Sequence, residues 1–379
     1  MTETRCTVFA RTLYDGASEE AQRDMLIGIE GGRIAFITSG DAAGASHFAD
    51  IVTPGLIDLQ INGAADVQFN DDPTVDALAR IAQGAAEGGT AHILPTFITA
   101  PGRDYTQAIA AARAAIEAGV PGILGLHLEG PFLSPRRPGI HDPAAIRPMD
   151  SEDIELLTQP FPGPLLLTVA PEELPEGAAQ ALTRAGVILF AGHSAATATE
   201  VEQAAAEGLS GATHLFNAMS QIGPREPGVV GAVLTSERMY AGIIADGHHV
   251  AWRNVALAAR LMPDRLCLVT DAMRSLAGVE TSFDLHGETI HLVDGRLTND
   301  KGTLAGAHVA MDESLRNMIA QGIASPGAAV RMASHNPAAA LGLQNALGSL
   351  RVGHRASLTL FDADMYAKMT ICDGHVLRP

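Results

Sequence analysis

Three residues that each end an apolar run carry the side chains of a metal site. Glu129 ends the run Ile123–Glu129 and is followed by a Gly-Pro pair, while His193 and His214 end two later runs. A carboxylate at a buried strand end is costly unless a cation, a metal or a proton compensates it. Two imidazoles and one carboxylate, with water in the open position, are typical of catalytic zinc. The three residues are far apart in the sequence, so the prediction depends on a fold that brings the strand ends together.

A general base is predicted beside these ligands. Asp271 ends the run Leu266–Asp271, and an aspartate next to a metal-activated water can accept a proton and later deliver it to a leaving group. A cap for the following loop is an equal alternative for this segment alone, and the strand-end position favours the base. Gln60 and Asn62 follow an earlier run. Because amides are poor ligands for transition metals, this pair predicts one metal ion rather than two.

Several polar turns have the composition of an anion-binding site. Arginine and backbone N–H groups suit a phosphate, and small residues allow a ligand to approach the backbone closely. The usual alternative for Arg225 is a surface ion pair with its neighbour Glu226. The candidates in these turns are Asn217, Ala218, Arg225, Asp246, His249 and the small-residue loop Leu304, Ala305 and Gly306.

The elements that must position these residues alternate between strand-like and helix-like runs. The apolar runs lie at Leu56–Gln60, Thr90–Pro95, Ile123–Glu129, Leu165–Ala170, Val187–Gly192, Gly211–His214, Tyr240–Asp246 and Leu266–Asp271. Helical patterns lie at Val75–Glu87, Tyr105–Ala118, Ala178–Ala185, Thr197–Glu207 and Trp252–Leu261, with two more at His308–Gln321 and Pro326–Leu341. Repeated βα units predict a parallel sheet, and eight of them predict a (β/α)8 TIM-type barrel. An open doubly wound sheet is the alternative; polar residues at so many strand ends favour the barrel.

Both chain ends are predicted to form a second, smaller domain. Residues 1–50 contain a pair of β-like runs joined by Gly31-Gly32, and residues 345–379 contain a similar pair joined by Asp373-Gly374. Such pairs are typical of hairpins, and neither end has enough strands for a stable sheet alone. We therefore expect a small β-sandwich domain from both ends and a barrel spanning residues 51–344.

The composition indicates a globular protein and argues against two classes of partner. The chain has 379 residues, 47% of them hydrophobic, and a formal net charge of −18, which argues against nucleic acid or an anionic membrane as a partner. Its three cysteines are widely spaced, as suits a reducing compartment. There is no signal-like N-terminus and no apolar run of about 18 residues. We expect a cytoplasmic globular protein.

On the basis of these motifs, the chain resembles the N-acetylglucosamine-6-phosphate deacetylase family of the amidohydrolase superfamily. The matching segments occur in the family's order and cover nearly the whole chain. They are Pro54–Gly63, His127–Phe132, Gly192–Ser194, Thr213–Met219, Arg225–Gly228, Ala245–His249, Thr270–Met273 and Thr303–Gly306. The segments His-Leu-Glu-Gly-Pro-Phe and His-Leu-Phe-Asn-Ala-Met are specific together, whereas either alone would be weak.

The resemblance implies hydrolysis of N-acetyl-D-glucosamine 6-phosphate to D-glucosamine 6-phosphate and acetate, in amino-sugar catabolism. By position, Glu129, His193 and His214 would hold one divalent metal ion per subunit, Asp271 would be base and then acid, and His141 would polarise the acetamide carbonyl. Ile140, His141, Asn217, Ala218, Arg225, Asp246, His249, Leu304, Ala305 and Gly306 would contact substrate. The resemblance also implies a homodimer in which Arg225 reaches the neighbouring active site.

Several questions stay open at this stage. Zn²⁺ is the first expectation for the metal, but a Glu/His/His set also accepts Fe²⁺, Co²⁺ or Mn²⁺. The nearest alternative substrate is the galacto epimer, N-acetylgalactosamine 6-phosphate. A cyclic-amide hydrolase would carry a His-x-His pair and a bridging lysine, whereas Lys301 and Lys368 are the only lysines and neither ends a barrel strand. A non-catalytic sugar-phosphate sensor is the alternative from another class.

Overall fold

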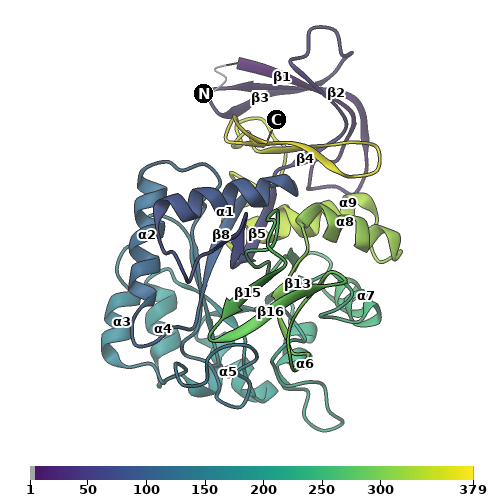
Figure 1. Ribbon diagram of the computed structural model, residues 1–379. Helices are drawn as coiled ribbons and strands as arrows, with labels where there is room; N and C mark the ends of the chain where they lie inside the picture. Colours follow the sequence, from purple (N-terminus) through teal and green to yellow (C-terminus); the bar gives the residue numbers. More distant parts are fainter. Residues whose placement is uncertain (1–4, 379) are drawn as a thin grey trace.

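The computed structural model describes residues 5–378 and contains a barrel with a smaller β domain at one end (Figure 1). Eight parallel strands form the barrel in chain order. They are β5 (Leu56–Ile61), β8 (Thr90–Ile98), β9 (Leu126–Glu129), β10 (Leu165–Val169), β11 (Ile188–Ala191), β12 (Leu209–Ala212), β13 (Tyr240–Ile244) and β14 (Leu266–Val269). The predicted fold class is confirmed, and each predicted run overlaps one of these strands.

The barrel closes between its first and last strands, just where site residues were predicted. The backbone N–H of Asp271 donates to the carbonyl of Gln60 at 2.9 Å, and that of Asn62 donates to the carbonyl of Ala272 at 2.8 Å. Closure of the barrel therefore places the side-chain amides of Gln60 and Asn62 next to the Asp271 carboxylate.

Helices surround the barrel and follow it. They are α1 (Val75–Glu87), α2 (Tyr105–Glu117), α3 (Ser151–Leu157), α4 (Ala178–Arg184), α5 (Ala198–Ala206), α6 (Gly228–Thr235), α7 (Trp252–Leu261), α8 (Met311–Ala320), α9 (Pro326–Ala333) and α10 (His335–Ala340). Thr197 begins α5 with a capping box closed by Glu200, which satisfies the helix's first free N–H groups. The single helix predicted over Pro326–Leu341 was wrong: non-helical backbone at Ser334 separates α9 from α10. No helix among residues 5–378 is long and apolar enough to cross a membrane.

The two chain ends form one β domain, as expected. Its strands are β1 (Arg5–Leu13), β2 (Gln22–Glu30), β3 (Arg33–Ser39), β4 (His47–Pro54), β19 (Leu358–Phe361), β20 (Ala367–Cys372) and β21 (His375–Arg378), paired in the order β21-β20-β19-β4-β1-β2-β3. The pairing of β4 with β19 joins the N-terminal and C-terminal parts. Apolar side chains from both parts share one core.

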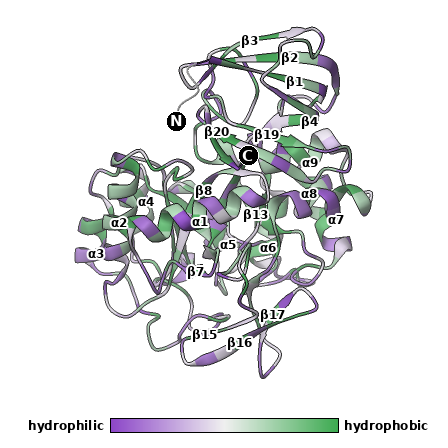
Figure 2. Ribbon diagram, turned by 45° about the horizontal axis from the view of Figure 1, so that its top comes forward, coloured by the Kyte–Doolittle hydropathy of each residue, from purple (hydrophilic) through white to green (hydrophobic). Residues whose placement is uncertain are grey.

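A four-stranded antiparallel sheet follows the last barrel strand and was not predicted. Its strands are β15 (Ser282–Leu285), β16 (Glu288–Val293), β17 (Arg296–Asn299) and β18 (Leu304–Ala307). Residues Leu304–Gly306, expected in a loop, therefore lie in a strand. Figure 2 shows this sheet at the end of the barrel opposite the β domain. Its apolar side packs on Ile98 and Met273, so it covers the rim where the strand ends meet. A further short hairpin, β6 (Gly63–Ala64) with β7 (Val67–Gln68), follows β5.

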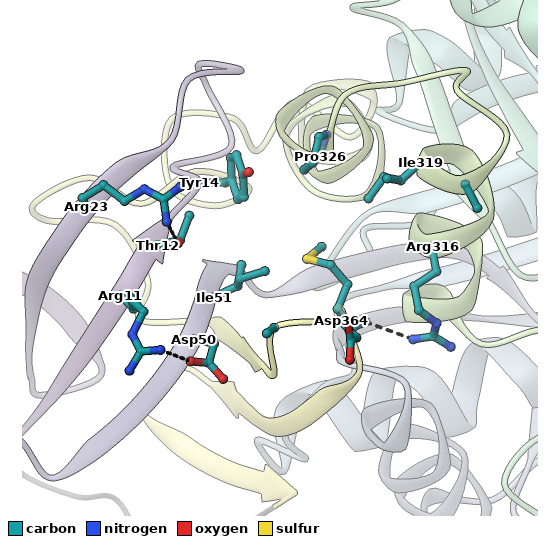
Figure 3. Close-up of a pocket in the computed structure, with 13 residues that line it drawn as sticks. Arg11, Thr12, Tyr14, Arg23, Asp50, Ile51, Arg316, Ile319, Pro326 and Asp364 are labelled. Carbon is teal, nitrogen blue, oxygen red and sulfur yellow. Dashed lines mark hydrogen bonds and ion pairs between the residues drawn. The ribbon is translucent and has the colours of Figure 1, made fainter.

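The junction of the two domains contains a cavity of about 600 Å³ (Figure 3). Its wall includes Arg11, Arg23 and Arg316. Arg11 pairs with Asp50 at 3.2 Å, and Arg316 pairs with a carboxylate of its own helix. The Arg23 guanidinium donates to a threonine hydroxyl. These arginines serve contacts within the protein, and none of the predicted site residues lies here.

A second group of titratable side chains lies at the same junction. The His92 Nε2 atom is 2.8 Å from the Ser357 hydroxyl, and the Cys372 sulfur is 3.7 Å from His92 Nδ1. His92, Cys372 and Asp373 offer three potential metal-ligand atoms close together. However, the Arg355 guanidinium donates to both carboxylate oxygens of Asp373 and so neutralises it. We interpret the group as a buried contact between barrel and β domain.

The free energy of unfolding should fall as the pH drops from about 6.5 to about 4, partly because of His92. Burial lowers the pKa of His92 from 6.5 to about 4, so within this window the unfolded chain binds a proton that the folded chain does not. The loss of unfolding free energy from His92 should reach about 3 kcal/mol at about pH 4 and should vanish above about pH 6.5. Urea unfolding of the wild type and His92→Gln across this range checks it, because the variant should depend less on pH. Equal dependence would refute the assignment.

Candidate active site

Glu129, His193 and His214 meet at the carboxyl ends of β9, β11 and β12. The Glu129 Oε1 atom is 3.1 Å from His193 Nε2 and 2.9 Å from His214 Nε2, and the two nitrogens are 3.0 Å apart. All three side chains are buried. The predicted ligand set is thus assembled from strand ends separated by long stretches of sequence.

The geometry of this cluster suits a cation at its centre. His193 Nδ1 lies 3.0 Å from the backbone carbonyl of Arg137, an acceptor, so Nδ1 carries the proton of the neutral ring. His193 Nε2 then points a lone pair at a carboxylate oxygen. Two imidazole nitrogens and a carboxylate oxygen that lie this close together suit a divalent metal, and these residues therefore fit such an ion.

The backbone at the strand ends is held in an uncommon conformation. His193, His214 and Asp271 have φ values of 46°, 31° and 50°, in the left-handed region that non-glycine residues rarely adopt. Strain of this kind persists only where the surroundings enforce it. Around His193, the N–H of Ser134 donates to the His193 carbonyl at 2.9 Å, and Glu172 accepts the hydroxyl of Ser194 at 2.7 Å. The turns that aim the ligands inward are thus enforced by specific contacts.

Asp271 lies beside the cluster and is linked to it by the two amides. The Asn62 side-chain amide donates to Asp271 Oδ1 at 2.7 Å. The Gln60 amide donates to the same oxygen at 3.1 Å and to Glu129 Oε2 at 3.2 Å. The N–H donor of Gln60 therefore lies between the carboxylates of Glu129 and Asp271.

Burial and the nearby negative charge of Glu129 raise the pKa of Asp271 to about 6. A base must be ionised to accept a proton, and it returns that proton most easily if its pKa lies near the working pH. The environment of Asp271 therefore suits a group that first accepts and then donates a proton.

His141 lies against the same cluster, on the loop after Glu129. Its Nε2 atom is 4.0 Å from Glu129 Oε1, and its ring centroid is 4.2 Å from that of His193. Burial, reinforced by His193, holds the pKa of His141 well below its usual value. Its Nδ1 atom is 2.8 Å from the hydroxyl of Thr99, so Nε2 is the nitrogen turned towards the cluster.

These side chains open into one cavity of about 320 Å³ under the four-stranded sheet. The predicted residues that line it are Glu129, Ile140, His141, His193, His214, Asn217, Ala218, His249, Asp271, Leu304 and Gly306. The sequence analysis missed Ile98, Gly139, Met273, Gly302 and Thr303, which also line it. Met273 and Thr303 lie in segments that carry the family resemblance, and Ile98 lies at a strand end, whereas Gly139 and Gly302 carried no signal in the sequence.

Three predicted contact residues lie outside this cavity wall. Asp246 accepts from the N–H and from ring Nδ1 of His249, the latter at 2.6 Å, so it orients His249 instead of facing the cavity. Although burial opposes its ionisation, these hydrogen bonds hold the pKa of Asp246 below its usual value. Ala305 is buried in the core of the four-stranded sheet. Arg225 is exposed, and Glu226 accepts instead from the backbone N–H groups of residues 198 and 228.

Comparison with known proteins agrees with this site. The profile of the Amidohydrolase family matches residues 51–377. The N-acetylglucosamine-6-phosphate deacetylase of Haemophilus influenzae is 36% identical over 326 residues, which is 85% of each chain. The N-acetylgalactosamine-6-phosphate deacetylase of Escherichia coli O157:H7 is 33% identical and covers 93% of this chain and 94% of its own.

Solved structures give the same result. The crystal structure of N-acetylglucosamine-6-phosphate deacetylase from Pasteurella multocida has a TM-score of 0.93 at 33% identity and covers 98% of this chain and 99% of its own. A mutant of the Mycobacterium smegmatis deacetylase in complex with N-acetyl-D-glucosamine-6-phosphate has a TM-score of 0.89 at 29% identity, covering 99% and 100%. The chain belongs to the amidohydrolase family. Within that family, these relatives are deacetylases of N-acetylhexosamine 6-phosphates.

Proposed function

We propose that this protein hydrolyses the N-acetyl group of N-acetyl-D-glucosamine 6-phosphate, giving D-glucosamine 6-phosphate and acetate in amino-sugar catabolism. The observation that carries the proposal is the convergence of Glu129, His193 and His214 beside Asp271 in one cavity. A non-catalytic sugar-phosphate sensor would need the pocket but not a proton acceptor beside the ligand set.

The chain's own residues supply the proton transfers. Glu129, His193 and His214 would hold a divalent metal ion, which would supply Lewis acidity towards the carbonyl and the attacking water. Asp271 accepts the proton of that water and later delivers it to the amine nitrogen as the C–N bond breaks. His141 Nε2 donates to the carbonyl oxygen as negative charge develops on it. The amides of Gln60 and Asn62 hold the Asp271 carboxylate in place by donating to its Oδ1 atom.

The identity of the metal belongs to this proposal. One ion per subunit is expected, because the position between Glu129 and Asp271 is filled by the Gln60 amide. Zn²⁺ suits the Glu/His/His donors, and Fe²⁺, Co²⁺ and Mn²⁺ accept the same set. A cytoplasmic location is proposed as well, supported by Cys267 and Cys372, which are buried thiols rather than disulfides.

The galacto epimer is the second candidate substrate, because the Escherichia coli relative named for it covers more of this chain than the Haemophilus influenzae one. One experiment tests both: acetate release from the two N-acetylhexosamine 6-phosphates, with and without chelator. We expect a higher kcat/KM for the gluco substrate and loss of both activities on chelation. A higher kcat/KM for the galacto substrate would reverse the assignment, and no acetate from either sugar would overturn the proposed activity.

We further propose that Arg225 binds the substrate phosphate of a neighbouring subunit in a homodimer. The support is its position: Arg225 is exposed and outside the cavity of its own chain, and no carboxylate in residues 5–378 is within ion-pair distance of it. Its neighbour Ile222 is 57% exposed, so the same loop presents an apolar side chain that a partner would cover.

Arg225→Ala should raise KM about 10- to 100-fold with little change in kcat, because one charge-assisted phosphate contact is lost. Mixing this variant with Asp271→Asn separates the two arrangements. If Arg225 acts across the interface, each mixed dimer contains one site with both residues intact, and activity at low substrate should return to about a quarter of the wild-type value. No recovery in mixtures shown to exchange subunits would place Arg225 in its own subunit's site.

A further inference from the structure

The turn after barrel strand β10 holds the residues that directly follow His193. This turn is the short helix η1 (Pro171–Glu173), and the Glu172 side chain within it is 4% exposed. The Glu172 Oε2 atom accepts the Ser194 hydroxyl at 2.7 Å, and the Oε1 atom accepts the backbone N–H of Ala195 at 2.5 Å. One buried carboxylate therefore uses both of its oxygens to hold the two residues after His193.

The direction of these hydrogen bonds follows from the atoms involved. A carboxylate accepts and does not donate, so Ser194 gives its single hydroxyl hydrogen to Glu172. The same hydroxyl oxygen accepts the backbone N–H of Ala196 at 3.0 Å. The Arg136 guanidinium lies 3.9 Å from Glu172 Oε1 and offsets part of the charge. Both contacts with Glu172 are charge-assisted, which makes them stronger than the neutral hydrogen bonds of an ordinary turn.

The chain is anchored on both sides of His193. The backbone N–H of Gly192 donates to a carbonyl of β10 at 3.0 Å, and the N–H of Ser194 donates to the carbonyl of Ala218 at 3.1 Å. Because both neighbours are held, His193 cannot leave its left-handed φ of 46° without breaking some of these contacts. Strain of this kind persists only where the surroundings over-determine the conformation. Glu172 supplies two of the contacts that do so.

The position of the His193 ring depends on this backbone conformation. The Nδ1–H group donates to the Arg137 carbonyl at 3.0 Å, and Gly139 leaves room for the ring, because a Cβ there would lie 2.9 Å from His193 Cε1. His193 Nε2 then lies 3.1 Å from Glu129 Oε1 and 3.0 Å from His214 Nε2. Rotation about φ would carry the Cβ atom of His193, and with it the ring, away from these two atoms.

We propose that Glu172 is a positioning residue for the metal site: its carboxylate fixes the turn after His193 and so keeps His193 Nε2 in place for the ion. The role rests on the proposed function, to which the ligand set of Glu129, His193 and His214 belongs. Glu172 does not line the cavity and is not one of the clustered ligand residues. Its removal should therefore weaken metal binding although all three ligand side chains remain present.

The test measures the dissociation constant for Zn²⁺, by competition with a chromophoric chelator, in the wild type and in Glu172→Ala. We expect the constant to rise about 10- to 100-fold, as is typical when a partner that orients a metal-binding histidine is lost. Glu200→Ala is the matched control, because the Glu200 carboxylate also accepts one backbone N–H and one hydroxyl, both from Thr197, at 2.7 and 2.8 Å. It lies in the next helix, α5, and its loss should lower the unfolding midpoint but leave the Zn²⁺ affinity at the wild-type value. If Glu172→Ala does not fold, Glu172→Gln, which keeps one accepting oxygen, is compared with Glu200→Gln instead.

A second comparison ties the effect to His193. In a His193→Ala background, Glu172→Ala should change the Zn²⁺ dissociation constant by less than about 2-fold, because the ligand that Glu172 positions is already absent. Wild-type affinity in Glu172→Ala, an equal loss in Glu200→Ala, or an undiminished effect in the His193→Ala background would each overturn the proposal. A wild type that binds Zn²⁺ but releases no acetate would refute the proposed function instead, and the Zn²⁺ affinities would still decide the role of Glu172.

Discussion

Asp271→Asn is expected to lower kcat about 10³-fold while fold and metal content remain as in the wild type. The substitution keeps the size of the side chain and an oxygen that can accept the amides of Gln60 and Asn62. An amide cannot accept the proton of the attacking water or return it to the leaving amine, so both proton transfers are lost. General acid–base groups contribute about 10²- to 10⁴-fold, and Asp271 serves in both steps.

The measurement is steady-state acetate release together with metal content and the unfolding midpoint. Asp264→Asn is a suitable control, since it removes a surface carboxylate paired with Arg331 and should leave kcat unchanged. Turnover of Asp271→Asn within about 10-fold of the wild type would remove Asp271 from its role, because water alone does not replace a positioned base and acid this well.

Glu129→Gln should abolish bound metal and, with it, nearly all turnover. The Glu129 carboxylate is the only anion in direct contact with both His193 Nε2 and His214 Nε2 among residues 5–378. An uncharged amide there offers a weak ligand and leaves the ion's charge uncompensated in a buried site. The remaining two imidazoles should bind metal only weakly, and activity should fall by at least about 10³-fold.

Elemental analysis after gel filtration measures the metal, and added Zn²⁺ should not restore activity. Asp153→Asn is the matched control, because it also neutralises a buried carboxylate, one that pairs with Arg147 at 2.6 Å. That variant should lose stability but keep one metal ion per chain. Wild-type metal content in Glu129→Gln would exclude Glu129 as a ligand.

The sequence by itself determined the barrel and the residue types of its centre. Eight apolar runs alternating with helical ones define a parallel βα arrangement, and parallel strands in a barrel bring their carboxyl ends to one rim. Glu129, His193, His214 and Asp271 each end such a run, so their meeting followed from topology alone. The chemistry of these four side chains, and of the neighbouring amides, follows from the residue types alone.

Only the tertiary structure decided which atoms face one another. That the Gln60 amide donates to both Glu129 and Asp271 depends on how the first and last strands close, and Thr99 met His141 only through a loop that returns across another strand. The covering sheet went unpredicted because its short strands are stabilised by packing on the barrel rim, which local sequence does not encode. The spacing and type of the residues specify which strand ends converge. The hydrogen bonds between those side chains, and the sheet that covers them, depend on long-range packing.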